Sequence, residues 1–313
     1  LLNHAGVGRN VSITCLLSGH DPASSKDNIM TVGSGSHRYE CVDGWPQLPA
    51  GLTLGWIGSV ATDRQGRVYC FCRGTHPMVV FDTAGQVEAT WGDEYLNHAH
   101  GVFIDTDDRL WLTDRYAQVI WVCETDGTVV RRLGYPNVTS ADGGFFNHPT
   151  NMHLGPDGSV YVSDGYAANC CHRFSADGRL LLSWGSAGHE PGQFNLPHGI
   201  WVLSDNRVLV ADRENHRIQV FDTEGVFLEQ WHGFRQPSDF FVDEAAGLIY
   251  LAEVGGRVSI LDLDGSVVTA WESPVPGGRP FKAPHGIWVD SEGAIYVGEV
   301  QRDDALYKFE PLT

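Results

Sequence analysis

The sequence has almost no segment in which apolar residues recur at helical spacing, and no apolar run approaches the roughly 18 residues of a membrane span. Basic residues are also few. The 21 Lys and Arg residues stand against 39 Asp and Glu residues, so the formal net charge is −18. A negative field of this size repels phosphate backbones and anionic lipid surfaces. These features argue against a helical or membrane-spanning protein, and we expect neither nucleic acid nor a membrane as a partner.

The cysteines show neither the paired CxxC spacing of a zinc site nor the even spacing of a disulfide framework. There are seven, an odd number, and they include the neighbours Cys170 and Cys171 and the pair Cys70 and Cys72. We therefore expect buried, reduced thiols, which favours a cytoplasmic location. The chain starts with Leu1 and shows no basic and apolar leader, so a secreted protein that has lost its signal peptide stays open.

Glycine, in contrast, is abundant. The chain has 37 glycines in 313 residues, about 12% against a usual value of roughly 7%, and it also has 10 Trp, 10 Tyr and 14 Phe. Hydrophobic residues make up 42% and charged residues only 19%, which is typical of a packed globular chain. This composition predicts many short strands separated by tight turns.

A pattern of roughly 40 residues recurs along the chain. It is clearest at 98–134 and 196–231, where an apolar strand is followed by a polar turn and a second strand, LWLTD or VLVAD. A third strand, IWVCE or IQVFD, then leads through a turn containing DG or EG to a fourth, VVRRL or VFLEQW. Each copy therefore predicts a sheet of four antiparallel strands joined by hairpins.

The other copies of this pattern lie at 53–92, 148–185, 236–271 and 283–310. The last copy ends after three strands, and the segment HRYECVDGW at 37–45 offers the missing fourth. Pairing that strand into the last sheet would close the ring and remove its open edges. The sequence thus predicts an all-β, six-bladed β-propeller as a single domain over 36–313, with 1–35 as an N-terminal tail or lid.

One position at the start of each first strand shows a strict alternation. In chain order it holds Gly58, His100, Thr150, His198, Ser238 and His285. The blades of such a ring are about 60° apart, so alternate blades place three imidazoles about 120° apart around the axis. That is the arrangement of a three-histidine metal site with an open fourth position.

Each histidine taken alone could be a hydrogen-bonded structural residue of the repeat. A repeat consensus would fill all six blades, however, so the alternation favours metal binding. Imidazole ligands make zinc the first choice, with iron, manganese and cobalt left open.

Two further candidates, Arg73 and Tyr166, depart from their repeat. Arg73 ends a second strand where other blades carry aspartate, and Tyr166 and Arg213 each follow such an aspartate closely. All three would lie on the face where the first strands start. An arginine could bind a carboxylate or stabilise an oxyanion, and a tyrosine could act as a base. An Arg–Asp pair between blades and a packed aromatic ring are the structural alternatives.

Several segments resemble the NHL-repeat propellers and, among them, the peptidyl-α-hydroxyglycine α-amidating lyase family. The resemblance covers roughly 55–310, and its most specific motifs are HGVFIDTD, PTNMHLGPDGSVYVSDGY, SWGSAGHEPGQFNLPHGI, VADRENHRIQVF and the final PHGIWV. It implies a six-bladed propeller with zinc held on the axis by His100, His198 and His285. It also implies catalytic roles for Arg73 and Tyr166 and a substrate-binding role for Arg213.

The chain departs from this family at several positions. The family's calcium site would use the backbone carbonyls of Val60 and Val102, but its aspartate is Gly286 here, which argues against calcium. A pocket methionine is replaced by Ala283. The family's disulfide cysteines are replaced at Asn147, Ala167, Leu209 and Val220.

The first functional hypothesis is a zinc-dependent lyase that splits the C–N bond of an α-hydroxyglycine-type carbinolamide into an amide and glyoxylate. Its substrate would be a small molecule or the C-terminus of a peptide. The second is a zinc-dependent hydrolase or hydratase, or another lyase, on a different small polar substrate. The third is a non-catalytic NHL propeller that binds a protein partner. The sequence leaves the oligomeric state open.

Overall fold

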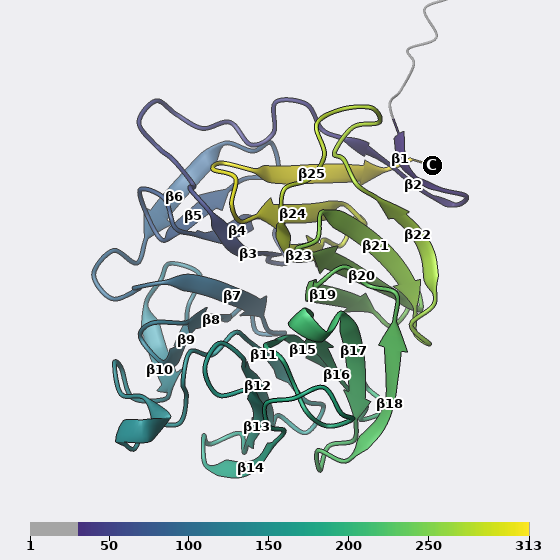
Figure 1. Cartoon of the computed structure of the whole chain (residues 1–313). Coiled ribbons are helices and arrows are strands. Elements are labelled where there is room, and N and C mark those ends of the chain that lie inside the picture. The colour runs from purple at the N-terminus through teal and green to yellow at the C-terminus, as the bar shows by residue number, and fades with distance from the viewer. Residues whose placement is uncertain (1–30, 313) are drawn as a thin grey trace, which may run out of the picture.

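The structure is a computed structural model that describes residues 31–312. These residues form six antiparallel sheets arranged around a central axis, as Figure 1 shows. Two short 3₁₀ helices, η1 (Ser140–Asp142) and η2 (Arg213–Asn215), are the only helical segments in this part of the chain. None of the described helices is long and apolar enough to cross a membrane. The predicted all-β six-bladed propeller is confirmed.

Each sheet is one blade and runs outward from the axis in chain order. The first blade contains β3 (Ile57–Thr62), β4 (Val68–Cys72), β5 (Met78–Phe81) and β6 (Val87–Trp91). The second contains β7 (Ala99–Ile104), β8 (Leu110–Asp114), β9 (Val119–Cys123) and β10 (Val129–Leu133). The third contains β11 (Asn151–Leu154), β12 (Val160–Asp164), β13 (Cys170–Phe174) and β14 (Leu180–Trp184).

The remaining blades continue the ring. The fourth contains β15 (Pro197–Val202), β16 (Val208–Asp212), β17 (Arg217–Phe221) and β18 (Phe227–His232). The fifth contains β19 (Pro237–Asp243), β20 (Leu248–Glu253), β21 (Arg257–Asp262) and β22 (Val267–Trp271). The sixth contains β23 (Pro284–Val289), β24 (Ile295–Glu299), β25 (Leu306–Pro311), β2 (His37–Cys41) and β1 (Thr31–Ser34).

Burial within a blade follows the strand order. Every residue of β4 and β8 is buried, because these strands have a neighbouring blade on both faces. The outermost strands β6 and β10 expose most of their residues to solvent. This explains why the inner strands are continuous apolar or small runs while the outer ones mix Arg, Glu and Thr with Val.

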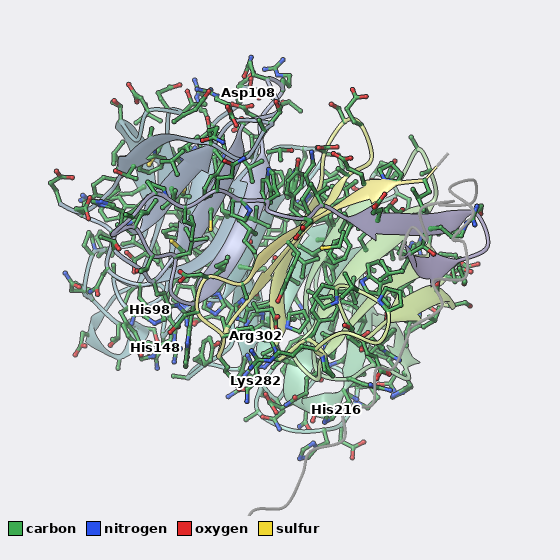
Figure 2. All side chains as sticks on the ribbon, turned by 90° about the horizontal axis from the view of Figure 1, so that it is seen from above. His98, Asp108, His148, His216, Lys282 and Arg302 are labelled. Carbon is green, nitrogen blue, oxygen red and sulfur yellow. The ribbon has the colours of Figure 1, made fainter. Side chains whose placement is uncertain are left out.

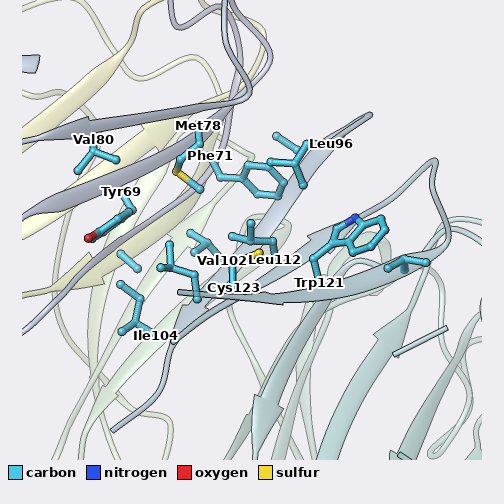
Figure 3. Packing of buried hydrophobic residues seen from close by; sticks show 14 residues of the cluster. Tyr69, Phe71, Met78, Val80, Leu96, Val102, Ile104, Leu112, Trp121 and Cys123 are labelled. Carbon is cyan, nitrogen blue, oxygen red and sulfur yellow. The ribbon is translucent and has the colours of Figure 1, made fainter. Parts of the chain in front are cut away.

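The apolar side chains of adjacent blades form the core. Between the first two blades, Tyr69, Phe71 and Met78 face Val102, Leu112 and Trp121 in one buried cluster, which Figure 3 shows from close by. The six cysteines of the described residues are all free, and four of them are fully or almost fully buried.

The N-terminal segment closes the ring, and it does so with two strands rather than one. β2 pairs antiparallel with β25, with Cys41 opposite Phe309, and β1 then pairs with β2 as a fifth strand of the sixth blade (Figure 1). The closing strand is therefore shorter than the predicted 37–45, because the chain turns away after Cys41. Residues 31–34, which were expected in the tail, belong to a blade. The rest of the predicted tail or lid lies outside the described residues.

Several pairs of neighbouring blades share one contact, in which a tryptophan of one blade packs against a turn glycine of the next. Gly127, in the turn between β9 and β10, has φ +86°, and a Cβ on it would lie 2.7 Å from the indole of Trp91 on β6. The same contact joins Trp184 to Gly225. At the closure, Trp45 covers Gly85 of the first blade. The N-terminal segment thus supplies the outer strands of the sixth blade and also the tryptophan that packs against the first blade.

We expect Trp45→Ala to lower the free energy of unfolding by about 3–5 kcal/mol, because it empties a packed site between the first and last blades. Trp45 is 8% exposed and its ring centroid lies 5.2 Å from that of Tyr296. Trp56→Ala is the control, since Trp56 is 43% exposed and its removal should cost less than about 1 kcal/mol. Urea unfolding of both variants measures the difference, and equal losses would contradict this account of the closure.

Candidate functional site

Three histidines meet on the propeller axis. His100, His198 and His285 lie near the starts of β7, β15 and β23, the innermost strands of alternate blades. Their ring centroids form a nearly equilateral triangle with sides of 4.7, 4.8 and 5.0 Å. One ligand atom from each lies within 4.8 Å of the other two. The structure therefore brings together the three residues that the alternation in the sequence selected.

The residues between these histidines in the ring explain the alternation. His100 Nδ1 is 2.5 Å from the carbonyl oxygen of Thr150, and His198 Nδ1 is 2.8 Å from that of Ser238. His285 Nδ1 is 2.7 Å from the carbonyl oxygen of Gly58. Each imidazole thus donates to the backbone of the next blade, at the equivalent position. At Gly58 a Cβ would lie 2.7 Å from the carbonyl oxygen of Ala99, so this blade has no room for a histidine.

These hydrogen bonds set the protonation of the three rings. A proton on Nδ1 leaves the lone pair on Nε2, which is the form that binds a metal. Burial, together with the neighbouring histidines, holds the pKa of His100 and His198 well below the usual range for imidazole. Burial and Arg73 lower the pKa of His285 to about 3. All three rings are therefore neutral at physiological pH.

The surroundings of His198 Nε2 indicate whether this histidine serves as a metal ligand or only as a structural residue. This atom is buried and has no hydrogen-bond partner among the described residues. A histidine kept only for structure would use both ring nitrogens, because an unpaired buried polar atom costs about 1–3 kcal/mol. Three neutral imidazoles with converging lone pairs fit a divalent transition metal with an open position.

Tyr166 lies directly beside the three histidines. Its hydroxyl is 3.1 Å from His100 Nε2, and Arg213 Nη1 lies 3.4 Å from the same hydroxyl. Arg73 is nearby, with Nε donating to the carbonyl oxygen of Ala99 at 3.0 Å. Burial lowers the pKa of the Arg73 guanidinium, and the closeness of Tyr166 partly opposes this. The predicted catalytic and substrate-binding residues therefore gather at one end of the axis.

Buried acids at the ends of the second strands position these side chains. Asp114 accepts hydrogen bonds from the backbone N–H groups of Asn97 and His98, at 2.6 and 3.0 Å. Asp212 accepts a hydrogen bond from the backbone N–H of Asn195 at 2.7 Å and forms an ion pair with Arg217 at 2.8 Å. Each acid ties the loop before the first strand to the end of the second, and so fixes the residue that follows the acid.

The structure corrects the register of Arg73. Cys72, which pairs with Ile57, occupies the position of Asp114, which pairs with Ala99. Arg73 therefore does not replace an aspartate. It follows that position, as Arg115 and Arg213 do in the second and fourth blades, and as Gly165 does in the third. The error arose because the first blade has no acid here to mark the strand end.

Arg115 is the site residue that the sequence analysis missed. The carbon of its guanidinium lies 3.4 Å from the ring centroid of Tyr166, so the two groups stack face to face. The signal was present, because LTDRYA around Arg115 repeats the Asp-Arg pair of VADREN around Arg213. Only the ring of blades shows that both arginines reach the same tyrosine.

The residues that directly follow the axial ring positions form a second layer. In this layer the sixth blade has Gly286, where the family resemblance leads us to expect an aspartate, and the fifth blade has Asp239. A Cβ on Gly286 would lie 2.5 Å from Ser59 Cα, so a larger residue has no room there. Asp239 on β19 lies in this layer and accepts a hydrogen bond from Asn151 Nδ2 at 2.7 Å. Burial raises its pKa to about 7. Val60 and Val102 lie on β3 and β7, and the expectation that this chain lacks the family's calcium site stays a prediction.

A second group of potential ligands lies in the third blade, where Cys170 Sγ and Asp164 Oδ2 are each 3.5 Å from His172 Nε2. Asp164 is the acid of this blade and accepts a hydrogen bond from Asn147 N at 2.6 Å. His172 also bonds to Ser183 at 2.7 Å. Because the acids of the other blades have equivalent partners on the third strand, such as Arg217, we interpret this group as a loop anchor.

A groove lies beside Arg73 on one face of the propeller. Figure 2 shows His98, His148, Lys282 and Arg302 along one face of the propeller and Asp108 on the opposite one. A groove of about 260 Å³ on this face is lined by Arg73, Asn97 and His98 among others. Asp93 also lines this groove, so it contains an acidic as well as a basic side chain.

Comparison with known proteins identifies one repeat and several relatives. The NHL repeat model matches residues 194–221, which cover the first three strands of the fourth blade. The chain is a six-bladed propeller with an NHL repeat in this blade. It is 29% identical over 88% of its length to peptidyl-glycine alpha-amidating monooxygenase B of Xenopus laevis, and it spans about a third, 36%, of that relative's length.

Two other relatives match most of the propeller. Peptidyl-alpha-hydroxyglycine alpha-amidating lyase 1 of Drosophila melanogaster is 24% identical over 94% of this chain and 64% of its own length. NHL repeat-containing protein 3 of Homo sapiens is 28% identical over 88% of this chain and 84% of its own length. The predicted resemblance to the amidating lyases is confirmed.

Among solved structures, a streptogramin B lyase superposes with a TM-score of 0.62 at 13% sequence identity. The match covers 87% of this chain and 97% of the other. At this identity the likeness concerns the propeller fold alone.

We expect the protein to bind one divalent transition-metal ion per chain at the three histidines. His198→Ala should lose most of this binding, because two imidazoles seldom hold such an ion well. His172→Ala is the matched control, since it removes a buried histidine from the third-blade anchor instead. Titration of the metal-stripped protein with Co²⁺, followed by visible absorption, measures both. Full binding in His198→Ala, or equal losses in the two variants, would contradict the assignment.

We also expect metal affinity to change little between pH 7 and pH 5. Ligands with an ordinary pKa near 6.5 would take up protons in this range and release the metal. Here burial already depresses the pKa, to about 3 for His285, so the folded site stays unprotonated. The dissociation constant for Co²⁺ at several pH values measures this, with circular dichroism to verify folding. A tenfold or larger loss of affinity by pH 5 in folded protein would contradict it.

Proposed function

We propose that this protein is a zinc-dependent lyase that cleaves the C–N bond of an α-hydroxyglycine-type carbinolamide to an amide and glyoxylate. The observation that carries the proposal is the placement of Tyr166 Oη, 3.1 Å from His100 Nε2 at the edge of the three-histidine site. The similarity to the amidating lyase of Drosophila over nearly the whole chain supports a lyase of this kind.

The three imidazoles fit the zinc ion that this chemistry requires. They are neutral, their Nδ1 protons are held by backbone carbonyls, and the buried Nε2 of His198 has no partner among residues 31–312. Zinc bound there would supply Lewis acidity that makes the substrate hydroxyl easier to deprotonate.

Tyr166 is the proposed base. Acting as a phenolate, it takes the proton of the substrate hydroxyl, and the O–H electron pair becomes the second bond of the glyoxylate carbonyl. The electron pair of the C–N bond goes to the nitrogen as that bond breaks. Tyr166 then returns the proton to this nitrogen, which gives a neutral amide. No oxidant, reductant or water molecule is consumed.

The arginines have separate roles in this scheme. Arg213 lies close enough to Tyr166, at 3.4 Å from its hydroxyl, to hold the substrate carboxylate beside the base. Arg73 Nη2 is buried and has no partner in the described part of the chain, so it can donate to the oxygen that gains charge. Glu214 bonds to Arg213 Nε at 2.9 Å and fixes the direction of that guanidinium.

A second candidate function is a protein-binding platform without chemistry. It stays a candidate because NHL repeat-containing protein 3, a relative matched over 84% of its length, has a name that states no reaction. Ala283, which is fully buried and stands where the family resemblance leads us to expect a methionine, favours instead a different small polar substrate at the same site. Metal binding and turnover by the purified protein separate the two candidates.

We expect Tyr166→Phe to lower kcat by on the order of 10²–10⁴-fold while metal content and fold stay unchanged, because only the acid–base group is removed. The assay is glyoxylate release from an N-acyl-α-hydroxyglycine by zinc-loaded protein. Tyr116→Phe is the control, since Tyr116 lies on the same face, 44% exposed, and stacks on His98 rather than facing the histidine site.

Undiminished activity in Tyr166→Phe would contradict the mechanism. Wild-type protein that is loaded with zinc but releases no glyoxylate would contradict the proposed substrate and leave the metal site as assigned.

A further inference from the structure

The proposed reaction leaves one cation of the site without a role. Arg73, Arg115 and Arg213 follow the second strands of three blades and all lie near Tyr166. Arg213 has Glu214 as an ion-pair partner at 2.9 Å, while Arg73 donates to a backbone carbonyl. The guanidinium of Arg115 forms no hydrogen bond or ion pair within residues 31–312.

The geometry of Arg115 leaves its donors available. Its guanidinium carbon is 3.4 Å from the ring centroid of Tyr166 and 5.0 Å from that of Tyr116. Stacking uses the face of a guanidinium, whereas its N–H bonds lie in the plane and point outward from the edge. Arg115 Nε is buried, and no acceptor among the described residues reaches it. An anionic oxygen is the partner that such a donor prefers.

The charge around Tyr166 is larger than the proposed substrate requires. Of the three guanidinium groups near Tyr166, only that of Arg213 has an ion-pair partner within residues 31–312, and this partner is Glu214. A simple α-hydroxyglycine brings one carboxylate, which Arg213 binds in the proposed mechanism.

We propose that Arg115 forms a second anion-binding subsite and that the natural substrate carries a second anionic group besides the carboxylate bound by Arg213. This rests on the proposed function for the place of the first carboxylate and the hydroxyl. The second group would reach Arg115 from the groove beside Arg73 and His98. A carboxylate and a phosphate both offer the oxygens that a guanidinium binds, so the substrate class is an α-hydroxy acid derivative with two negative groups.

The experiment compares three α-hydroxy acids that differ in their second group. Lactate has none, malate has a second carboxylate, and 3-phosphoglycerate has a phosphate. Their affinities for the zinc-loaded protein are measured by isothermal titration calorimetry, with zinc content checked afterwards. We expect malate or 3-phosphoglycerate to bind at least tenfold more tightly than lactate, and the tighter of the two identifies the second group.

The difference in affinity between the dianions and lactate, called the margin below, should depend on Arg115. In Arg115→Met we expect the more tightly bound dianion and lactate to bind with affinities that differ by less than twofold. Arg64→Met is the control, because it removes one positive charge from Arg64, which is 66% exposed and pairs with Asp108 on the opposite face (Figure 2). That variant should keep the full margin. If Arg115→Met does not fold, Arg115→Gln tests the same ratio.

No margin in the wild type, a margin that persists without Arg115, or an equal loss in Arg64→Met would each overturn the subsite. Glyoxylate release from an N-acyl-α-hydroxyglycine, measured in parallel, tests the reaction separately. Protein that is inactive in that assay but shows an Arg115-dependent margin would reject the proposed function and support the subsite. Active protein without the margin would do the reverse.

Discussion

The hydrogen bond from each axial imidazole to the next blade is the interaction on which the site depends. It joins His100 to Thr150, His198 to Ser238 and His285 to Gly58 through backbone carbonyls. Because the acceptor is backbone, the bond also ties neighbouring innermost strands together around the axis. The same contact fixes the tautomer, so that every Nε2 presents its lone pair to the centre. Fold and candidate metal site are therefore built by one set of contacts.

The repeat also determines how the charges are distributed. The acids at the second-strand ends, among them Asp114, Asp212 and Glu299, are fully buried and serve as anchors for backbone N–H groups and arginines. Most other acids lie on the surface, where they give the chain its charge of −18. The position after the end of the second strand holds arginine in three blades: Arg115 and Arg213 follow an acid, and Arg73 follows Cys72. A cationic site thus arises in an acidic protein because one repeat position is used for structure and the next for the site.

The site is asymmetric because the blades carry different residues after the ends of their second strands. Where the second and fourth blades place Arg115 and Arg213, the third has Gly165 followed by Tyr166. The tyrosine consequently reaches toward His100 between two guanidinium groups, at 3.4 and 5.5 Å from its ring centroid. Six equivalent blades would give six equivalent environments, whereas acid–base chemistry requires a single group next to the metal position. The departure from the repeat supplies that group.

The sequence by itself determined the blade number, the strand order and the three axial histidines, because these follow from a pattern that repeats every blade. It did not determine the register of Arg73, since the first blade has Cys72 where the pattern expects an acid. It also could not show that Arg115 stacks on Tyr166, or that Asp239 takes the layer below Gly286. Those contacts join blades that are 40 or more residues apart in the chain, and only closure of the ring by β2 and Trp45 sets the distances between them. Local periodicity decides which strands form, whereas the packing of six blades around one axis decides which side chains meet.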